Sequence, residues 1–437
     1  MSSTANFVEA AWAQARAEAD RCVGCGDCFT ACPMPAPAGL AAEAGGPAIA
    51  GLLDLVRGGP GTAEAARWAA VCTGSGSCIP ACSHGVNPRF LVKMADIAAK
   101  RQAADPAAVK AASAAGFVKM ARSANSFEAL MLDEAAAGRL RPPPGPVEAV
   151  PDVTFWTGCN VIKTPHIALL CLDVMDALGV SYAVRGGTGT CCGIYQTRGG
   201  DLAMAGRAAD ATARKLAEPG AAEVLTWCPS CYTQFTELVL PARAAAGEDD
   251  PFGMTPFLAF LDRRLDALRP LFRHRVEKRV ALHERPGLPQ VMQAARRILG
   301  SIPGLELVEI DVPRVGLMAN YLSVLPGFKA ATEQTELAAC AAAGVTTLAT
   351  VYHACHRDIC AYEDGRPFEI VNFMELVAET MGLDPRPDDY KRLKLLGDID
   401  AVMAETAPAI SAKGLDPAPL RAVLAADMAL PVDGGRR

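Results

Sequence analysis

Several kinds of segment are absent from this 437-residue sequence, and each absence excludes a class of protein. There is no run of eighteen apolar residues, so no segment is expected to span a bilayer. Residues 1–21 are acidic and helical in pattern, and they lack the basic and apolar regions of a secretory signal. The formal net charge of −6 gives no general attraction to nucleic acid or anionic lipid. These features predict a cytoplasmic protein, or one that reaches a membrane only through a partner.

The common catalytic signatures are missing too. The sequence has no phosphate-binding glycine fingerprint, no serine–histidine–acid candidate and no paired-carboxylate signature. What it does contain is cysteine: 16 residues, of which twelve fall into groups with short, fixed spacings. A globular chain of this length forms two or three domains with proper cores and does not need disulfide bonds to fold. The patterned cysteines are therefore expected to be metal ligands.

The first group has the spacing of a bacterial ferredoxin. Cys22, Cys25, Cys28 and Cys32 follow one another as C-x₂-C-x₂-C-x₃-C, and Pro33 comes directly after. This run is typical of iron–sulfur clusters bound by thiolates. A zinc site is the alternative, but zinc ligands come as two pairs and do not need this run.

A second run repeats the spacing with one replacement. Cys72, Cys78 and Cys82 are kept, whereas Ser75 stands where the second cysteine belongs. In such motifs the fourth cysteine of each run ligates the other cluster. The predicted ligand sets are Cys22, Cys25, Cys28 and Cys82 for cluster I, and Cys32, Cys72 and Cys78 for cluster II, with Ser75 at the vacant ligand position.

The nuclearity of cluster II stays open. An iron without a soft ligand is easily lost, so a [3Fe-4S] cluster is the first expectation. A [4Fe-4S] cluster with a serine or water ligand is the second, and complete loss of the cluster is the third. With one thiolate fewer, cluster II is expected to have a higher potential than the [4Fe-4S] cluster I.

The spacing between the two runs carries a resemblance. Thirty-nine residues separate Cys32 from Cys72, and the helices predicted at 48–56, 62–71 and 88–101 lie around the motifs. This resembles the helical ferredoxin of fumarate reductase and heterodisulfide reductase iron–sulfur subunits. The resemblance implies an all-α ferredoxin domain. In the fumarate reductase group a replaced second cysteine goes with a three-iron cluster, which the resemblance carries over to Ser75.

Five further cysteines lie in the middle of the chain. They are Cys159, Cys191, Cys192, Cys228 and Cys231. Each follows a predicted strand, and strands alternate here with helices, which predicts an α/β domain with a parallel sheet. Loops at the carboxyl ends of parallel strands lie together, so the five thiols are expected to converge.

The pattern of these five cysteines resembles the CCG domain of heterodisulfide reductase subunits, with relatives in glycolate and lactate oxidation systems. Together with the ferredoxin region, the resemblance covers about residues 15–380. It implies that the five cysteines hold an unusual [4Fe-4S] cluster with five thiolates, one of them bridging. A structural zinc ion held by four of the five is the alternative.

A second repeat is expected downstream with its metal site erased. Pro286 takes the place of the first cysteine, and Met318-Ala319-Asn320 stands where Cys-Cys-Gly belongs. When the spacing of the first repeat is continued from there, it leads to Cys355. The expected fold class is thus α/β, with duplicated CCG domains after an all-α ferredoxin domain. The predicted boundaries are 1–140 ferredoxin domain, 141–151 proline-rich linker, 152–245 first CCG domain, 246–278 helical bridge, 279–383 degenerate second domain and 384–437 a tail without chemistry.

A few polar residues and cysteines remain outside these sets. His283, His353, Cys355, His356 and Cys360 could line the vacated pocket and bind zinc or flavin, or dock a redox partner. A role in helix capping and packing is favoured over these. Cys171 and Cys340 fall on predicted helices and are expected to be small buried side chains.

These observations predict an iron–sulfur electron-transfer subunit of a multi-component oxidoreductase. Its partner would be a flavoprotein dehydrogenase or an electron-transferring flavoprotein, or a quinone-linked partner at the membrane. A disulfide reductase acting at the CCG cluster is the first alternative. A zinc-binding structural subunit is the second.

Overall fold

The computed structural model describes residues 3–141, 147–248 and 250–429, and its first part consists of helices. Among the described residues no strand precedes residue 153. These helices are α1 (Ser3–Arg21), α2 (Asp27–Thr30), α3 (Gly45–Arg57), α4 (Ala63–Ala70), α5 (Pro88–Ala103), α6 (Pro106–Met131) and α7 (Glu134–Leu140), with a 3-10 turn η1 (Ala42–Ala44). The proline-rich segment 142–146, predicted as a linker, lies outside the described residues.

Side-chain caps set the starts of these helices. The Thr62 hydroxyl accepts from the backbone N–H of Ala65 at the start of α4, and the Asn87 side chain caps α5 ahead of Pro88. The stretch from α6 to α7 is divided into two helices. Leu132 leaves the helical conformation, and Asp133 caps α7, so the chain turns there.

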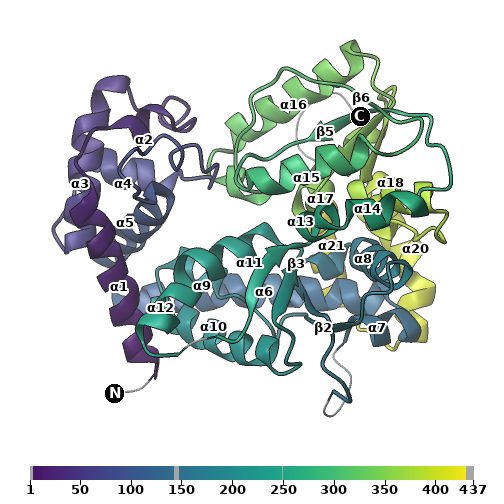
Figure 1. Ribbon diagram of the computed structural model, residues 1–437, viewed down its shortest axis with the longest axis horizontal. Helices are drawn as coiled ribbons and strands as arrows, with labels where there is room; N and C mark the ends of the chain where they lie inside the picture. Colours follow the sequence, from purple (N-terminus) through teal and green to yellow (C-terminus); the bar gives the residue numbers. More distant parts are fainter. Residues whose placement is uncertain (1–2, 142–146, 249, 430–437) are drawn as a thin grey trace.

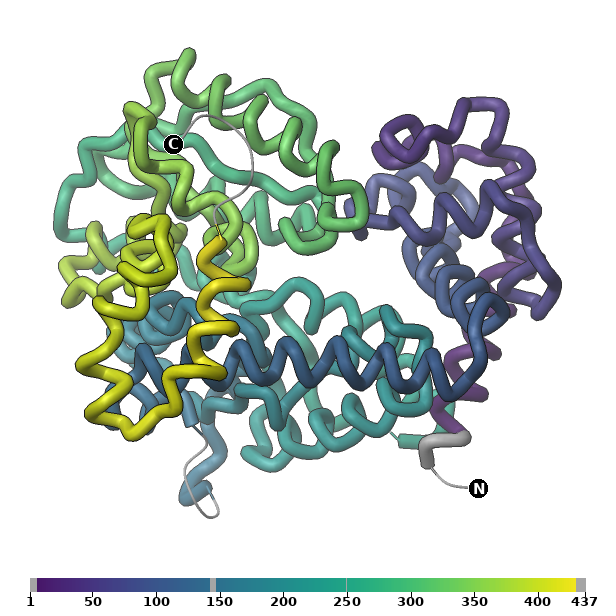
Figure 2. Tube along the Cα trace, turned by 180° about the vertical axis from the view of Figure 1, so that it is seen from behind, coloured from purple at the N-terminus to yellow at the C-terminus, as the bar shows by residue number. Residues whose placement is uncertain are grey.

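The long helix α6 links the helical part to the rest of the protein. Its side chains Met120, Phe127 and Leu130 are buried. Figure 2 shows α6 running from the helical part, past the first α/β unit, to the C-terminal helices.

The first sheet is parallel and has the strand order β2-β1-β3-β4. Its strands are β1 (Val153–Gly158), β2 (Tyr182–Gly186), β3 (Glu223–Thr226) and β4 (Gly253–Pro256). Its connecting helices are α8 (Pro165–Ala177), α9 (Ile194–Gly199), α10 (Leu202–Ala217), α11 (Pro229–Gln234) and α12 (Leu240–Ala245), with a 3-10 turn η2 (Val161–Lys163) and a π-helical turn η3 (Phe235–Val239).

Strand β4 corrects the prediction of a helical bridge over 246–278. Residues 253–256 pair with β3, and the Thr255 hydroxyl donates to Glu223 at 2.5 Å. A four-residue strand is too short to give a period-two pattern, which is why the sequence did not indicate it. Short helices follow it: α13 (Phe257–Arg263), α14 (Leu265–Leu268) and η4 (Arg269–Leu271).

The second sheet is also parallel, with the order β6-β5-β7-β8. Its strands are β5 (Arg279–His283), β6 (Glu306–Leu307), β7 (Thr347–Thr350) and β8 (Glu369–Asn372). The helices and 3-10 turns around it are α15 (Pro289–Leu299), η5 (Ala319–Val324), α16 (Pro326–Ala342), α17 (His353–Ile359), η6 (Cys360–Glu363) and α18 (Phe373–Met381). Counted within each sheet, the strand order is the same in both. In Figure 1 the two α/β units lie one above the other, with the helical part to one side.

The segment after residue 384, predicted as a tail, folds into three helices: α19 (Asp389–Leu395), α20 (Ile399–Ala412) and α21 (Pro417–Met428). Asp388, Asp398 and Asp416 each cap one of them. Their apolar side chains form a core with Phe127 and Leu130 of α6. No helix in the described part of the chain is long and apolar enough to cross a membrane.

Candidate metal centres

The four cysteines assigned to cluster I surround one cavity in the helical part. Cys22, Cys25, Cys28 and Cys82 line it, together with apolar side chains of α3 and α5 such as Leu52. Cys25 is exposed at the outer side of this cavity, and Val23 beside it is 63% exposed. The structure thus brings together two cysteine runs that are well separated in sequence, in the arrangement that the crossing rule requires.

The cluster II cysteines form a second group next to the first. Burial, and then the nearby Cys72 and Cys32 thiols, raise the pKa of Cys78 to about 12. The Trp68 indole N–H donates to the Cys32 sulfur at 3.4 Å. Three thiols that disfavour each other's ionisation are suited to a cation, which offsets the thiolate charge.

Ser75 keeps the backbone of a ligand position but turns its hydroxyl elsewhere. The glycines on either side of it have φ of 70° and 75°, close to the 75° and 86° on either side of Cys25. Its Oγ accepts from the Gly316 backbone N–H at 2.8 Å and lies 3.0 Å from the Thr73 hydroxyl. The serine is therefore held by the second α/β unit, at a loop next to Met318.

The five cysteines of the CCG pattern come from three loops and lie together. Each thiol lies close enough to the next to shift its pKa, so the five form one unbroken series. The order of contact is Cys159, Cys191, Cys192, Cys231, Cys228. All five are buried. The structure thus places the whole predicted set at the carboxyl ends of β1, β2 and β3.

Gly193, the glycine of the CCG triplet, is needed for steric reasons. It has φ of 81°, and a Cβ atom there would lie 2.7 Å from the backbone oxygen of Ala205 in α10. Its N–H donates to the Cys191 sulfur at 3.4 Å. Any other residue would push the loop away from α10 and move both neighbouring thiols.

The electrostatics of this group favour a bound cation. The neighbouring Cys159 and Cys192 thiols lower the pKa of Cys191. Cys191 and burial raise the pKa values of Cys159 and Cys192 well above their ordinary range. Burial and the closeness of the five thiols therefore oppose their joint ionisation unless a cation is bound. An iron–sulfur cluster bound by thiolates fits this donor set.

The five-cysteine site faces the second α/β unit. Burial raises the pKa of Tyr352, at the start of α17, and the nearby Cys355 and Cys228 thiols raise it further. Tyr321 of η5 hydrogen-bonds Ser230, between Cys228 and Cys231. The carboxyl ends of the two sheets therefore point toward each other.

Charged side chains line the pocket that the sequence predicts as an erased metal site. His283 Nδ1 lies 2.6 Å from Glu336 Oε2, and Arg314 donates to the other Glu336 oxygen at 2.9 Å. Arg285 donates to the Val315 backbone oxygen at 2.8 Å. Burial alone would raise the pKa of the Cys355 thiol, but Arg285 and His283 outweigh it and lower that pKa.

The residues predicted to line this pocket are divided among different places. Only His283 and Cys355 meet in it. The ring of His356 points to Asp388, 2.5 Å away, and the Cys360 sulfur lies 3.9 Å from the Arg357 backbone oxygen. Burial lowers the pKa of His353 well below its ordinary value. Cys171 and Cys340 are buried on helices, as predicted.

The His283–Glu336 pair predicts a loss of stability at high pH. Burial lowers the pKa of His283, but Glu336 outweighs burial and raises it from 6.5 to about 9. The charged histidine therefore stabilises the fold fully below about pH 6.5, and this contribution is lost as the pH rises through about 9. Its size is about 3 kcal/mol.

The apparent Tm tests this assignment. Between pH 7 and pH 10 we expect the apparent Tm of the unaltered protein to fall, and that of His283→Gln to fall less. The exposed His274→Gln is the control, and an equal fall in all three proteins would contradict the assignment.

A cleft of about 880 Å³ lies between the cluster II cysteines and the CCG loop. Its basic side chains are Arg89, Lys93, Lys100 and Arg198, and its acidic ones are Asp96 and Glu237. Cys72 lines one side, and Ile194, two residues after Cys192, lines the other. Arg89 forms a buried ion pair with Glu237. The sequence did not indicate this pair, because the partners are 148 residues apart and lie in different units.

Comparison with known proteins adds to this arrangement. The family model of the cysteine-rich domain CCG matches residues 153–236. One subunit of the dihydromethanophenazine:CoB–CoM heterodisulfide reductase from Methanosarcina barkeri (strain Fusaro / DSM 804) is 23% identical, over 84% of this chain and 95% of that one. A solved structure from Clostridium difficile 630, described as a transcriptional regulator, is 10% identical over 64% of this chain and 84% of its own, with a TM-score of 0.20, which is too low to bear on the fold. The chain therefore contains a CCG cysteine-rich domain, and over most of its length it is similar to a subunit of a heterodisulfide reductase, in agreement with the resemblance that its cysteine spacing carries.

Proposed function

We propose that this chain is the iron–sulfur electron-transfer subunit of a multi-component oxidoreductase in the cytoplasm. The observation that carries the proposal is the unbroken series of five buried CCG thiols, which fits a cluster with five thiolates better than a four-ligand zinc ion. Bound clusters would supply one-electron transfer. The proposed ligands are Cys22, Cys25, Cys28 and Cys82 for a [4Fe-4S] cluster I, Cys32, Cys72 and Cys78 for cluster II, and Cys159, Cys191, Cys192, Cys228 and Cys231 for the CCG-type [4Fe-4S] cluster.

The placement of the two ferredoxin motifs supports an order among these sites. The second motif faces the interior: Cys72 lines the cleft that also reaches Ile194, beside the CCG loop. The first motif faces outward, with Cys25 and Val23 exposed. We therefore infer that a partner docks at Cys25 and that cluster II lies between this partner and the CCG site. A flavoprotein dehydrogenase or electron-transferring flavoprotein is the proposed partner, or a quinone-linked protein at the membrane.

The second α/β unit is proposed to be a degenerate copy of the first. The strand orders of the two sheets agree, and the loops of the second unit occupy the positions that the CCG loops occupy in the first. Where a cluster would need thiolates, this unit has a buried Arg285 and the His283–Glu336 pair. A guanidinium held beside Cys355 supplies positive charge to that thiol, so no metal is needed there.

Metal analysis of the anaerobically purified protein tests the function. We expect a brown protein with iron and acid-labile sulfide in similar amounts, which bleaches on reduction and recovers on oxidation. A colourless preparation that contains zinc alone would overturn the proposal and favour the zinc-binding structural subunit.

The nuclearity of cluster II is tested by Ser75→Cys. Because Ser75 has the backbone of the ligand Cys25, a thiol here can complete the set, and iron is expected to rise by about one atom per chain. The three-iron EPR signal of the oxidised protein is expected to disappear. Ser77→Cys, which adds a thiol to the same loop outside the ligand pattern, is the control. It should change neither the iron content nor the three-iron EPR signal. If the unaltered protein lacks a three-iron signal and has eight ferredoxin-type irons, cluster II is a four-iron cluster with a serine or water ligand.

Reduction of a disulfide at the CCG site is the second candidate function. The basic side chains of the cleft beside the CCG loop favour it, because they suit an anionic substrate. Against it stands the second α/β unit, which lacks the second thiolate set. If a disulfide oxidises the reduced protein rapidly and stoichiometrically, disulfide reduction becomes the favoured function.

A further inference from the structure

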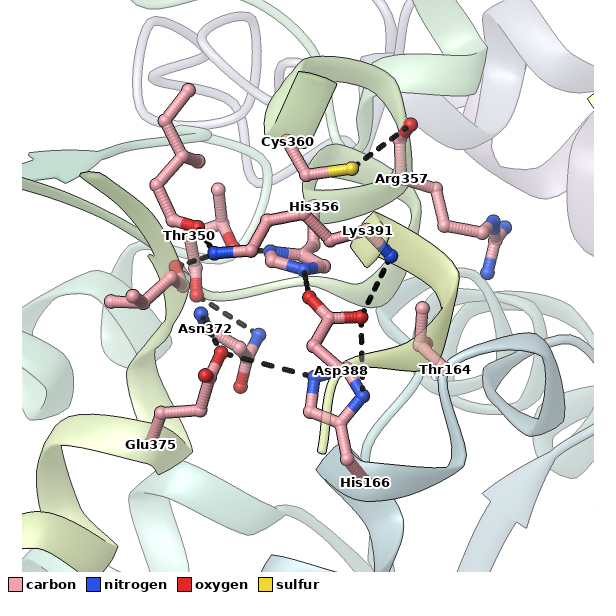
Figure 3. Close-up of polar contacts among 12 residues, drawn as sticks. Thr164, His166, Thr350, His356, Arg357, Cys360, Asn372, Glu375, Asp388 and Lys391 are labelled. Atoms are coloured by element: carbon pink, nitrogen blue, oxygen red, sulfur yellow. Dashed lines mark hydrogen bonds and ion pairs between the residues drawn. The ribbon is translucent and has the colours of Figure 1, made fainter. Parts of the chain in front are cut away.

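Two histidines and two carboxylates that belong to none of the cysteine sites meet between the two α/β units. His166 lies in the first turn of α8, His356 in α17, Glu375 in α18, and Asp388 caps α19. One ligand atom from each lies within 4.8 Å of all the others. Figure 3 shows the four side chains pointing toward one another. The group joins the first unit, the second unit and the C-terminal helices.

His166 is the member that ordinary packing leaves unexplained. It is 2% exposed, yet neither of its ring nitrogens has a hydrogen-bond partner among the described residues. Nδ1 lies 3.6 Å from an Asp388 oxygen, and Nε2 lies 3.8 Å from a Glu375 oxygen. Buried polar groups normally have a partner, and an imidazole that lies between two carboxylates without a hydrogen bond to either has the form of a metal ligand.

The hydrogen bonds of His356 also indicate that this side chain is placed to bind a metal ion. The Thr350 hydroxyl donates its single proton to the Val371 backbone oxygen at 3.1 Å, so toward His356 Nδ1, 3.0 Å away, it can only accept. His356 Nδ1 therefore carries a proton that it donates to Thr350, and Nε2 faces Asp388 Oδ2 at 2.5 Å. Two lone pairs repel at this distance unless a proton or a metal ion lies at Nε2. A threonine that fixes the tautomer of a ligating histidine is a common support of metal sites.

Both carboxylates are fixed in place and have spare lone pairs. Asp388 Oδ1 accepts from the Lys391 backbone N–H at 3.0 Å, and Glu375 Oε1 accepts from the Asn372 N–H at 2.6 Å. The Lys391 ammonium bonds Glu363 and the Ile370 backbone oxygen, each at 3.0 Å, and it forms no direct ion pair with either carboxylate. Burial raises the pKa of Glu375, and a cation would offset that cost.

We propose that His166, His356, Glu375 and Asp388 bind one divalent transition-metal ion of the zinc class, which ties the two α/β units to the C-terminal helices. Two imidazoles and two carboxylates suit zinc, and with bonds of 2.0–2.1 Å a tetrahedral ion needs donor atoms about 3.3 Å apart, so a small inward movement completes the site. Four protein ligands make a closed site of the structural kind. Glu375 lines an open cleft together with Arg275 and Arg386. Through this cleft the ion can reach the site from solvent.

The test uses the full-length protein, purified without oxygen from cells grown with added zinc. We expect about one zinc per chain in addition to the iron, and a zinc X-ray absorption spectrum with nitrogen or oxygen neighbours and no sulfur. Sulfur neighbours at about 2.3 Å would place the zinc on cysteines and overturn the proposal. Absence of zinc, in a protein that also takes up none when Zn²⁺ is added, would overturn it as well.

Variants locate the ion. His166→Ala with Asp388→Ala should lose the zinc while acid-labile sulfide stays unchanged, and the exposed His274→Ala should keep it. Thr350→Val, which leaves all four ligands, is expected to weaken zinc binding about 10- to 100-fold through the loss of the bond to His356. If the double variant does not fold, Thr350→Val decides the question, and unchanged zinc affinity there would contradict the assignment. Sulfide reports on the clusters separately, so failure of this proposal does not affect the proposed function.

Discussion

Replacing Cys192 by alanine is expected to remove about four iron atoms and four sulfides per chain, and to leave the clusters of the helical part in place. Cys192 is fully buried and lies in the middle of the five-thiol series, with Cys191 on one side and Cys231 on the other. Its loss divides the ligand set into two pairs. Alanine is chosen because a serine could still ligate iron. Iron and sulfide analysis, with the EPR spectrum of the remaining clusters, measures the effect.

The matched control for this variant is Cys171→Ala. Cys171 is equally buried in α8, follows β1 in the same unit and takes no part in the thiol series. It should keep its full iron content. Equal iron loss in both variants would mean that the unit is merely destabilised, and no loss in Cys192→Ala would remove this cysteine from the ligand set. A zinc ion needs only four thiolates, so retention of a zinc ion with sulfur neighbours in its X-ray absorption spectrum after the replacement would favour the zinc alternative.

The grouping of the cysteines in space could be predicted from the sequence because the cysteines of each loop are close neighbours in the chain. Cys191 with Cys192, and Cys228 with Cys231, identify their loops by spacing alone, and the strand before each loop fixes which edge of the sheet they share. Ser75 is a partial success. Its backbone matches that of a ligand, but its hydroxyl bonds Gly316 in the second unit, and no local pattern contains that information.

The features that sequence reasoning missed depend on contacts between distant segments. Most strands of the two sheets lie between His166 and Asp388 in the sequence. Each of these residues, taken alone, is an ordinary residue at the start of a helix. The C-terminal helices were missed for a different reason. Their proline and alanine content obscured the apolar stripe, although aspartate caps at 388, 398 and 416 mark each helix start and were a usable signal.

Arg89→Ala is expected to weaken the attachment of the helical part to both α/β units by about 3–5 kcal/mol. The Arg89 guanidinium is buried and bonds Glu237 through two nitrogens, one of them at 2.9 Å. Its third nitrogen donates to the Gly287 backbone oxygen at 2.7 Å. Removing the side chain leaves Glu237 buried with only Lys93, 3.4 Å away, as a charged partner. A lower apparent Tm and faster proteolysis between the units are the expected readouts.

Two further variants separate the buried charge from the general loss of an arginine. Arg57→Ala breaks an ion pair with Asp20 whose side chains are 47% and 70% exposed, so about 0–1 kcal/mol is expected. Arg89→Met with Glu237→Gln removes both charges and should be less destabilising than Arg89→Ala, because no carboxylate stays buried without its partner. If the double variant were the less stable of the two, a buried carboxylate without its partner would not explain the effect of Arg89→Ala. Since this arginine lines the cleft between Cys72 and the CCG loop, we also expect slower electron transfer between the ferredoxin clusters and the CCG site in Arg89→Ala, and unchanged transfer in Arg57→Ala.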